Sequence, residues 1–133
     1  MNNTILIVDD EADIREICCY LFTKQGWNVI EAEDGFSALE QINQHKPEII
    51  LTDVNMPMKS NGKPGLGGFD LITEIRKLKE SSSYEPFIFV MSGYLKNTDH
   101  VSQFPEVESY FDKPLSVKDM ESKIKQTTQR KVA

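Results

Sequence analysis

The chain has 133 residues, of which 39% are hydrophobic, enough to bury one core but not two independent ones. Its net charge of −6 argues against an electrostatic nucleic-acid binder, which would present a basic face. The chain has no apolar run near the roughly 18 to 20 residues that span a bilayer, and no basic segment before an apolar one at its N-terminus, so we expect neither membrane insertion nor a signal peptide.

Short apolar runs alternate with amphipathic stretches from the N-terminus onward. A continuous apolar run at 5–8, mostly β-branched, ends in three acidic residues, as a buried parallel strand would. Apolar side chains then recur at helical spacing over 14–22, and Gly26 is expected to end that helix. A weaker strand is predicted over 27–32, and Asp34 is placed to cap the short helix that follows it.

The middle of the chain repeats this alternation around a long loop. A third strand over 49–52 is fully apolar apart from its last residue and is followed by Asp53. Residues 54–68 are rich in glycine and proline and are predicted to form a loop. A helix over 71–78 and a fourth strand over 87–91 come next, which continues the strand–helix pattern.

The C-terminal part adds two helices and one strand. We predict a helix over 96–104, a strand over 108–111, and a last helix that begins at Ser116. The polar tail is expected to fray, which gives one domain over 1–126 and a tail or linker start over 127–133. Five strands that alternate with five helices indicate the α/β class, with a doubly wound parallel sheet.

Polar residues follow the predicted strands at the ends where such sheets bind ligands. They are Asp9, Asp10, Asp53, Ser92 and Lys113. Clustered carboxylates repel one another unless a cation joins them, and Mg²⁺ prefers carboxylate oxygens. A carboxylate nucleophile, a metal and a lysine are the parts needed to form an aspartyl phosphate. Each residue also has an ordinary explanation, such as a helix cap or a turn, but their coincidence at the strand ends favours a site.

Five motifs occur in a fixed order and are spread along the chain between residues 5 and 114. They are ILIVDDEAD at 5–13, ILTDVNMP at 50–57, GFDLI at 68–72, FIFVMSG at 87–93 and YFDKP at 110–114. Together they resemble the receiver domain of two-component response regulators. The resemblance implies a flavodoxin-like sheet of order 2-1-3-4-5 with five helices.

The resemblance also implies a magnesium site. Asp10 matches the direct metal ligand, and Asp9 matches the acid that holds the metal through water. Asp53 matches the phosphoacceptor, which also binds the ion, and Asn55 matches the residue whose backbone carbonyl completes the site. Mg²⁺ is therefore the expected cofactor.

The remaining matched residues have roles at the phosphoryl group. Lys113 matches the lysine that contacts it, and Ser92 matches the switch hydroxyl that moves toward it. Tyr110 matches the switch aromatic residue, three positions before the lysine. Two segments depart from the family pattern: the loop 58–67 contains an insertion, which is either a surface excursion or part of the site, and 104–107 lacks the usual small residues.

The function implied by the resemblance is phosphoryl acceptance by Asp53 from a histidine kinase or a histidine phosphotransfer protein. We expect a downstream protein target, a homodimer that forms on phosphorylation, a cytoplasmic location, no direct nucleic-acid contact and no enzymatic turnover. One alternative is an unphosphorylated pseudo-receiver that acts only by protein interaction. Another, a phosphatase of the haloacid dehalogenase type, requires a second acid two residues after its nucleophile, where Asn55 stands.

Overall fold

The computed structural model describes residues 3–54, 59–60, 63–64, 68–92, 104–113 and 115–132. Their centre is a five-stranded sheet of order β2-β1-β3-β6-β7, in which every neighbouring pair is parallel. The strands are β1 (Thr4–Val8), β2 (Asn28–Ala32), β3 (Ile49–Asp53), β6 (Phe87–Ser92) and β7 (Val107–Asp112). Since β6 and β7 are the fourth and fifth predicted strands, the order 2-1-3-4-5 is confirmed.

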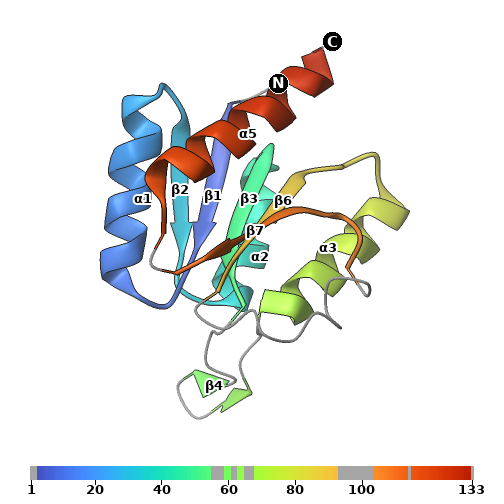
Figure 1. The fold of residues 1–133 in the computed structure, drawn as a ribbon. Helices are drawn as coiled ribbons and strands as arrows, with labels where there is room; N and C mark the ends of the chain where they lie inside the picture. The colour runs from blue at the N-terminus through green and yellow to red at the C-terminus, as the bar shows by residue number, and fades with distance from the viewer. Residues whose placement is uncertain are drawn as a thin grey trace.

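Helices cover both faces of the sheet. They are α1 (Ala12–Lys24), α2 (Gly35–His45), α3 (Gly68–Ser81) and α5 (Val117–Val132). α1 and α5 lie on one face, and α2 and α3 lie on the other (Figure 1). None of the helices in the described ranges is long and apolar enough to cross a bilayer.

The two covered faces explain why β1 is apolar at each position from Ile5 to Val8. Ile5 and Ile7 pack in the core beneath α1 and α5, while Leu6 and Val8 pack in the core beneath α2 and α3. A strand covered on both sides buries both sets of alternating side chains, so it reads as a continuous apolar run. β3 repeats the pattern, and its five residues are all buried.

Two predicted helix signals are confirmed. The Asp34 side chain accepts a hydrogen bond of 2.8 Å from the Ser37 N–H and caps α2. After α1 the chain reverses at Gly26, which has φ +95° and donates its N–H to the Thr23 carbonyl. Glycine adopts this left-handed conformation without the steric cost that a Cβ brings.

Three predicted segments either differ in detail from the structure or are not tested by it. The loop between β3 and α3 contains a two-residue antiparallel ladder, β4 (Lys59–Ser60) with β5 (Lys63–Pro64), near the carboxyl ends of the sheet strands (Figure 1). The helix expected over 96–104 lies almost wholly outside the described residues. The segment after position 126 is helical in the structure, since α5 continues to Val132, and within it Thr127 is buried and its hydroxyl donates to the Lys123 carbonyl; fraying of this tail stays a prediction.

Candidate functional site

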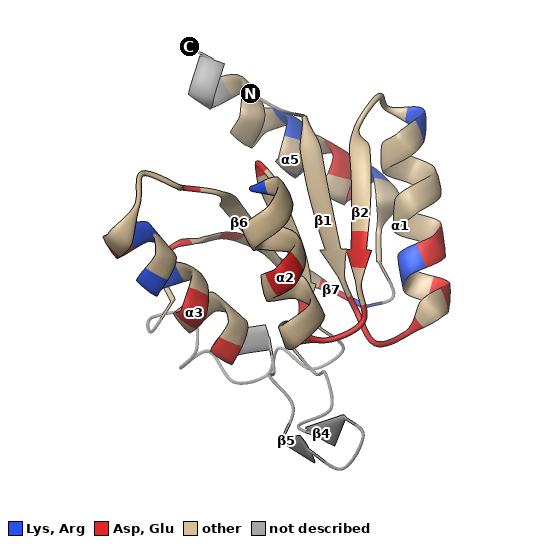
Figure 2. Cartoon of the chain, turned by 180° about the vertical axis from the view of Figure 1, so that it is seen from behind, with Lys and Arg blue, Asp and Glu red and all other residues tan. Residues whose placement is uncertain are grey.

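The carboxyl ends of the strands bring the predicted residues to one edge of the sheet. Asp9 directly follows β1, Asp53 ends β3, Ser92 ends β6, and Lys113 directly follows β7. Acidic residues are concentrated in the segments that follow β1 and β2, at this edge (Figure 2). The parallel topology therefore places residues that are far apart in sequence side by side.

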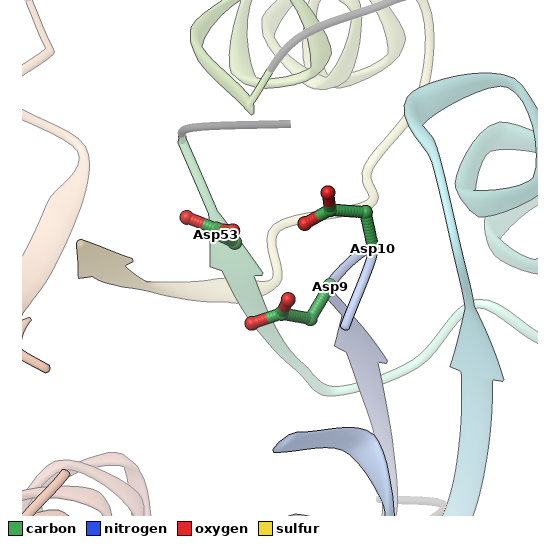
Figure 3. A group of neighbouring side chains, drawn as sticks. All are labelled: Asp9, Asp10 and Asp53. Carbon is green, nitrogen blue, oxygen red and sulfur yellow. The ribbon is translucent and has the colours of Figure 1, made fainter. Parts of the chain in front are cut away.

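Three carboxylates form the centre of the site. One oxygen each from Asp9, Asp10 and Asp53 lies within 4.8 Å of the others. Figure 3 shows the three side chains gathered at the ends of β1 and β3. Asp9 is fully buried and the Asp53 side chain is only 3% exposed, whereas Asp10 is exposed. The negative charge is thus partly shielded from water, which strengthens the mutual repulsion.

Lys113 supplies the positive charge that faces these acids. Its Nζ lies 2.9 Å from Asp9 Oδ2 and 3.2 Å from Asp53 Oδ2, and 3.8 Å from Glu11 Oε2. Burial alone lowers the pKa of Lys113, but the hydrogen bond to Asp9 and the charges of Asp53 and Asp9 outweigh it and raise the pKa above 10.5. The lysine is therefore charged at neutral pH and holds the two buried acids together.

The acidic cluster has the chemistry of a divalent-cation site. Partial desolvation of the carboxyl group, followed by the charge of Asp9, raises the pKa of Asp10 above its ordinary value of 3.8. A raised acid pKa means that the ionised carboxylate is disfavoured where it stands, and a bound cation reverses that penalty. Asp9 already accepts hydrogen bonds from the Glu11 N–H and from Lys113. The exposed Asp10 carboxylate is consequently the acid most accessible to an entering ion.

The backbone of Asp9 is held by a residue that sequence reasoning did not single out. The Arg15 guanidinium donates a hydrogen bond of 2.8 Å to the Asp9 carbonyl and lies 3.3 Å from the Glu31 carboxylate. Arg15 belongs to the first turns of α1 and Glu31 to β2. The only sequence signal was a basic residue shortly after an acidic strand end, and that signal does not identify a partner.

Two of the other predicted residues, Ser92 and Tyr110, are described by the structure, and the third, Asn55, is not. Ser92 is fully buried at the end of β6, and its carbonyl accepts a hydrogen bond of 2.9 Å from the Lys113 N–H. Tyr110 is half-buried in β7, and among the described residues none pairs with its buried hydroxyl. Asn55, the predicted carbonyl ligand, lies outside the described residues, so its place in the site stays a prediction.

An arginine on α3 fixes the segment before β7. Arg76 makes two hydrogen bonds to Glu106, Nε to Oε2 at 2.7 Å and Nη2 to Oε1 at 2.8 Å, and its guanidinium carbon lies 5.4 Å from the centre of the Phe104 ring. The hydrogen bonds from Arg76 lower the pKa of Glu106. Burial and then the charge of Glu106 raise the pKa of Tyr110, so the pair lies near the predicted switch aromatic residue. This segment is one of the two that depart from the family pattern.

The Arg76–Glu106 pair should make stability depend on pH. The folded-state pKa of Glu106 lies below its ordinary value of 4.5, so its contribution is present above that pH and is lost as the pH falls through the folded-state pKa. Glu106→Gln should therefore have a lower urea midpoint than wild type at pH 7, and the difference should shrink in acid. Glu16→Gln, at an exposed position of α1, is the control. A constant difference between pH 7 and about pH 3 would contradict the charge-pair explanation.

Comparisons with known sequences agree with this geometry. A family model described as the response regulator receiver domain matches residues 5–125. The phosphate regulon transcriptional regulatory protein PhoB of Escherichia coli (strain K12) is 30% identical over 131 residues, which cover 98% of this chain and 53% of PhoB. Sporulation initiation phosphotransferase F of Bacillus subtilis (strain 168) is 25% identical, with 94% of this chain and 93% of that protein covered. The chain thus spans about half the length of PhoB and nearly all of phosphotransferase F.

Solved structures show the same fold. A response regulator receiver domain protein from Clostridium thermocellum matches with a TM-score of 0.79 at 22% identity, covering 96% of this chain and 95% of that one. Response regulator protein TrrA from Thermotoga maritima, solved in complex with Mg²⁺-BeF, has a TM-score of 0.74 at 25% identity, with 92% and 96% covered. The family match over most of the sequence, together with these structural likenesses, shows that the chain belongs to the response regulator receiver domain family.

Proposed function

We propose that Asp53 accepts a phosphoryl group from a phosphohistidine of a histidine kinase or a histidine phosphotransfer protein. The observation that carries the proposal is the position of the Asp53 carboxylate, at the end of the central strand, 3.2 Å from the Lys113 ammonium and beside two further acids. Membership of the receiver family supports it. The same proposal includes a two-component phosphorelay as the pathway and a downstream protein as the target of the phosphorylated form.

The transfer converts the Asp53 carboxylate to an acyl phosphate. A carboxylate oxygen attacks the phosphorus in line, the phosphorus–nitrogen bond of the phosphohistidine breaks, and the imidazole nitrogen keeps the bonding electron pair. Lys113 stabilises the negative charge on the transferring phosphoryl oxygens, because its ammonium already lies between Asp9 and Asp53. We propose that Ser92, at the end of the neighbouring strand, donates to the new phosphoryl group and that Tyr110 moves in response.

The site fits a magnesium ion. Asp10 and Asp53 would hold it directly, Asp9 through water, and the Asn55 carbonyl would complete the set, as the family resemblance implies. When bound, Mg²⁺ neutralises charge on the acids and on the phosphoryl oxygens. The cluster of three carboxylates supports this assignment, and so does the presence of Mg²⁺-BeF in the related TrrA structure.

Mass spectrometry after incubation with acetyl phosphate and Mg²⁺ tests the phosphoacceptor. Wild-type protein should gain about 80 Da, the mass of one phosphoryl group. Asp53→Asn should gain nothing while keeping its fold, since the amide is isosteric but is not a nucleophile. Ser116→Ala, at the exposed start of α5, is the control and should gain the same mass as wild type.

Two outcomes would contradict the proposal. Labelling of Asp53→Asn at another residue would overturn the site, and an unmodified wild-type protein would favour the alternative, a pseudo-receiver that works only by protein interaction. We propose further that the protein is a phosphoacceptor without turnover of a separate substrate, and therefore not an enzyme. A cytoplasmic location and a homodimer that forms on phosphorylation stay predictions.

A further inference from the structure

The loop that carries the acid pair is tied to its neighbours at the backbone. The Asp9 N–H donates to the Ala32 carbonyl at 3.1 Å, and the Asp9 carbonyl accepts the 2.8 Å hydrogen bond from Arg15 Nη1. Both backbone polar groups of Asp9 are therefore bonded, one to the end of β2 and one to α1. The Asp10 carboxylate follows one residue later, so its position depends on this peptide.

The start of α1 does not stabilise this loop in the usual way. Glu11 is the N-cap residue, and its side chain makes no capping hydrogen bond. Helix starts are commonly stabilised by such a bond. At this helix the side chain of Arg15 reaches back past the first turn instead, and its Nε lies 3.3 Å from Glu31 Oε1 on β2. One planar guanidinium thus joins the β1–α1 loop to the edge of the neighbouring strand.

We propose that Arg15 is a positioning residue: it holds the Asp9–Asp10 backbone so that the acids converge with Asp53, and thereby sets the affinity of the site for a divalent cation. The inference rests on the proposed magnesium site. The proposal and simple electrostatics predict opposite changes in cation affinity when Arg15 is replaced. Removing a positive charge near three carboxylates should by itself strengthen cation binding. Loss of the positioning hydrogen bonds should weaken it.

The conservative replacement separates geometry from charge. Lysine keeps the positive charge but has a single ammonium in place of the planar fork, so it cannot reproduce two directed bonds to Asp9 and Glu31. Arg15→Lys has the same net charge as wild type, which removes the electrostatic difference. If Arg15 acts through its fork, both Arg15→Lys and Arg15→Ala should bind Mg²⁺ more weakly.

Calorimetric titration of Mg²⁺ into the folded proteins is the test. Partners that orient metal ligands typically change affinity by 10- to 100-fold, so we expect about a 10-fold loss for Arg15→Ala and a smaller loss for Arg15→Lys. Lys24→Ala removes a positive charge from the other end of α1 and is the matched control, expected to bind as wild type does or slightly more tightly. Urea unfolding of each variant without Mg²⁺ measures stability separately.

The outcomes distinguish the inference from the function on which it rests. Wild-type protein that binds Mg²⁺, with unchanged or tighter binding in both Arg15 variants, would overturn the role of Arg15 and leave the proposed function intact. Wild-type protein that gives no Mg²⁺ binding would overturn the magnesium site and this inference together. A loss of stability in Arg15→Ala without a loss of affinity would show a merely structural residue, which also contradicts the proposal.

Discussion

Lys113→Ala should lower the free energy of unfolding by about 3 kcal/mol at pH 7 in the absence of divalent cations. The variant leaves two almost fully buried carboxylates, Asp9 and Asp53, without the ammonium that lies 2.9 and 3.2 Å from them. Removing one partner of a buried charge pair is costly because the remaining charge stays desolvated. Urea unfolding in EDTA measures the effect.

The pH range over which Lys113 stabilises the fold follows from the shift of its pKa. Because the folded-state pKa of Lys113 lies above the ordinary 10.5, its stabilisation is complete below that pH and is lost only as the pH rises through the folded-state value. The full effect is therefore present at pH 7. Added Mg²⁺ should restore part of the lost stability, since a cation can take over the neutralisation of the acids.

A matched lysine separates this effect from the general loss of a positive charge. Lys118 is exposed on α5, and Lys118→Ala should change stability by no more than about 0.5 kcal/mol. Equal losses for the two alanine variants would mean that the contacts of Lys113 with Asp9 and Asp53 contribute nothing measurable to folding. An unchanged Lys113→Ala in the presence of Mg²⁺, with a clear loss in EDTA, would support the shared role of lysine and cation.

The convergence of Asp9, Asp53 and Lys113 was predictable because topology alone decides it. Apolar runs that end in polar residues identify the strands, and parallel strands bring those ends to one edge whatever the lengths of the connections between them. The same argument placed Ser92 correctly at the end of β6. A distance of 2.9 Å between Lys113 and Asp9, by contrast, depends on side-chain conformations that no periodicity encodes.

Other features had no signal in the sequence pattern. Arg15 and Arg76 each pair with an acid on a different element, Glu31 on β2 and Glu106 before β7. Long-range ion pairs leave no trace in hydrophobic spacing, so their partners emerge only from the folded chain. Thr127 is a further example, because it reads as polar in the sequence although the fold buries it in α5.

A third buried acid, besides Asp9 and Asp53, lies at the opposite edge of the sheet. Glu48 precedes β3, where its N–H donates to the Thr4 carbonyl and its carbonyl accepts from the Phe87 N–H, each at 2.9 Å. The residue is 7% exposed, and within the described part of the chain no group donates a hydrogen bond to either carboxylate oxygen. Burying even a neutral polar group without a partner costs roughly 1 to 3 kcal/mol by mutational measures, and an ionised carboxylate costs more.

Glu48→Met should therefore raise the free energy of unfolding by about 1 to 2 kcal/mol, since an apolar side chain of similar length removes the unpaired oxygens. Glu40→Met, on the exposed side of α2, removes the same charge from a chain of net charge −6 and controls for reduced self-repulsion. Glu48→Gln should gain less, because its amide stays polar and buried. Phosphoryl uptake from acetyl phosphate should be unchanged in all three variants, since these positions lie away from Asp53.

Glu48 and Asp9 differ in whether their buried carboxylates have hydrogen-bond partners among the described residues. Asp9 is even more deeply buried, yet it accepts hydrogen bonds from Lys113 and from the Glu11 N–H, so its charge is compensated where the proposed chemistry needs it. Glu48 has no such compensation among the described residues. A loss of stability in Glu48→Met would show that the carboxylate has a favourable partner after all, and a loss of phosphoryl uptake would connect this far edge of the sheet to the site.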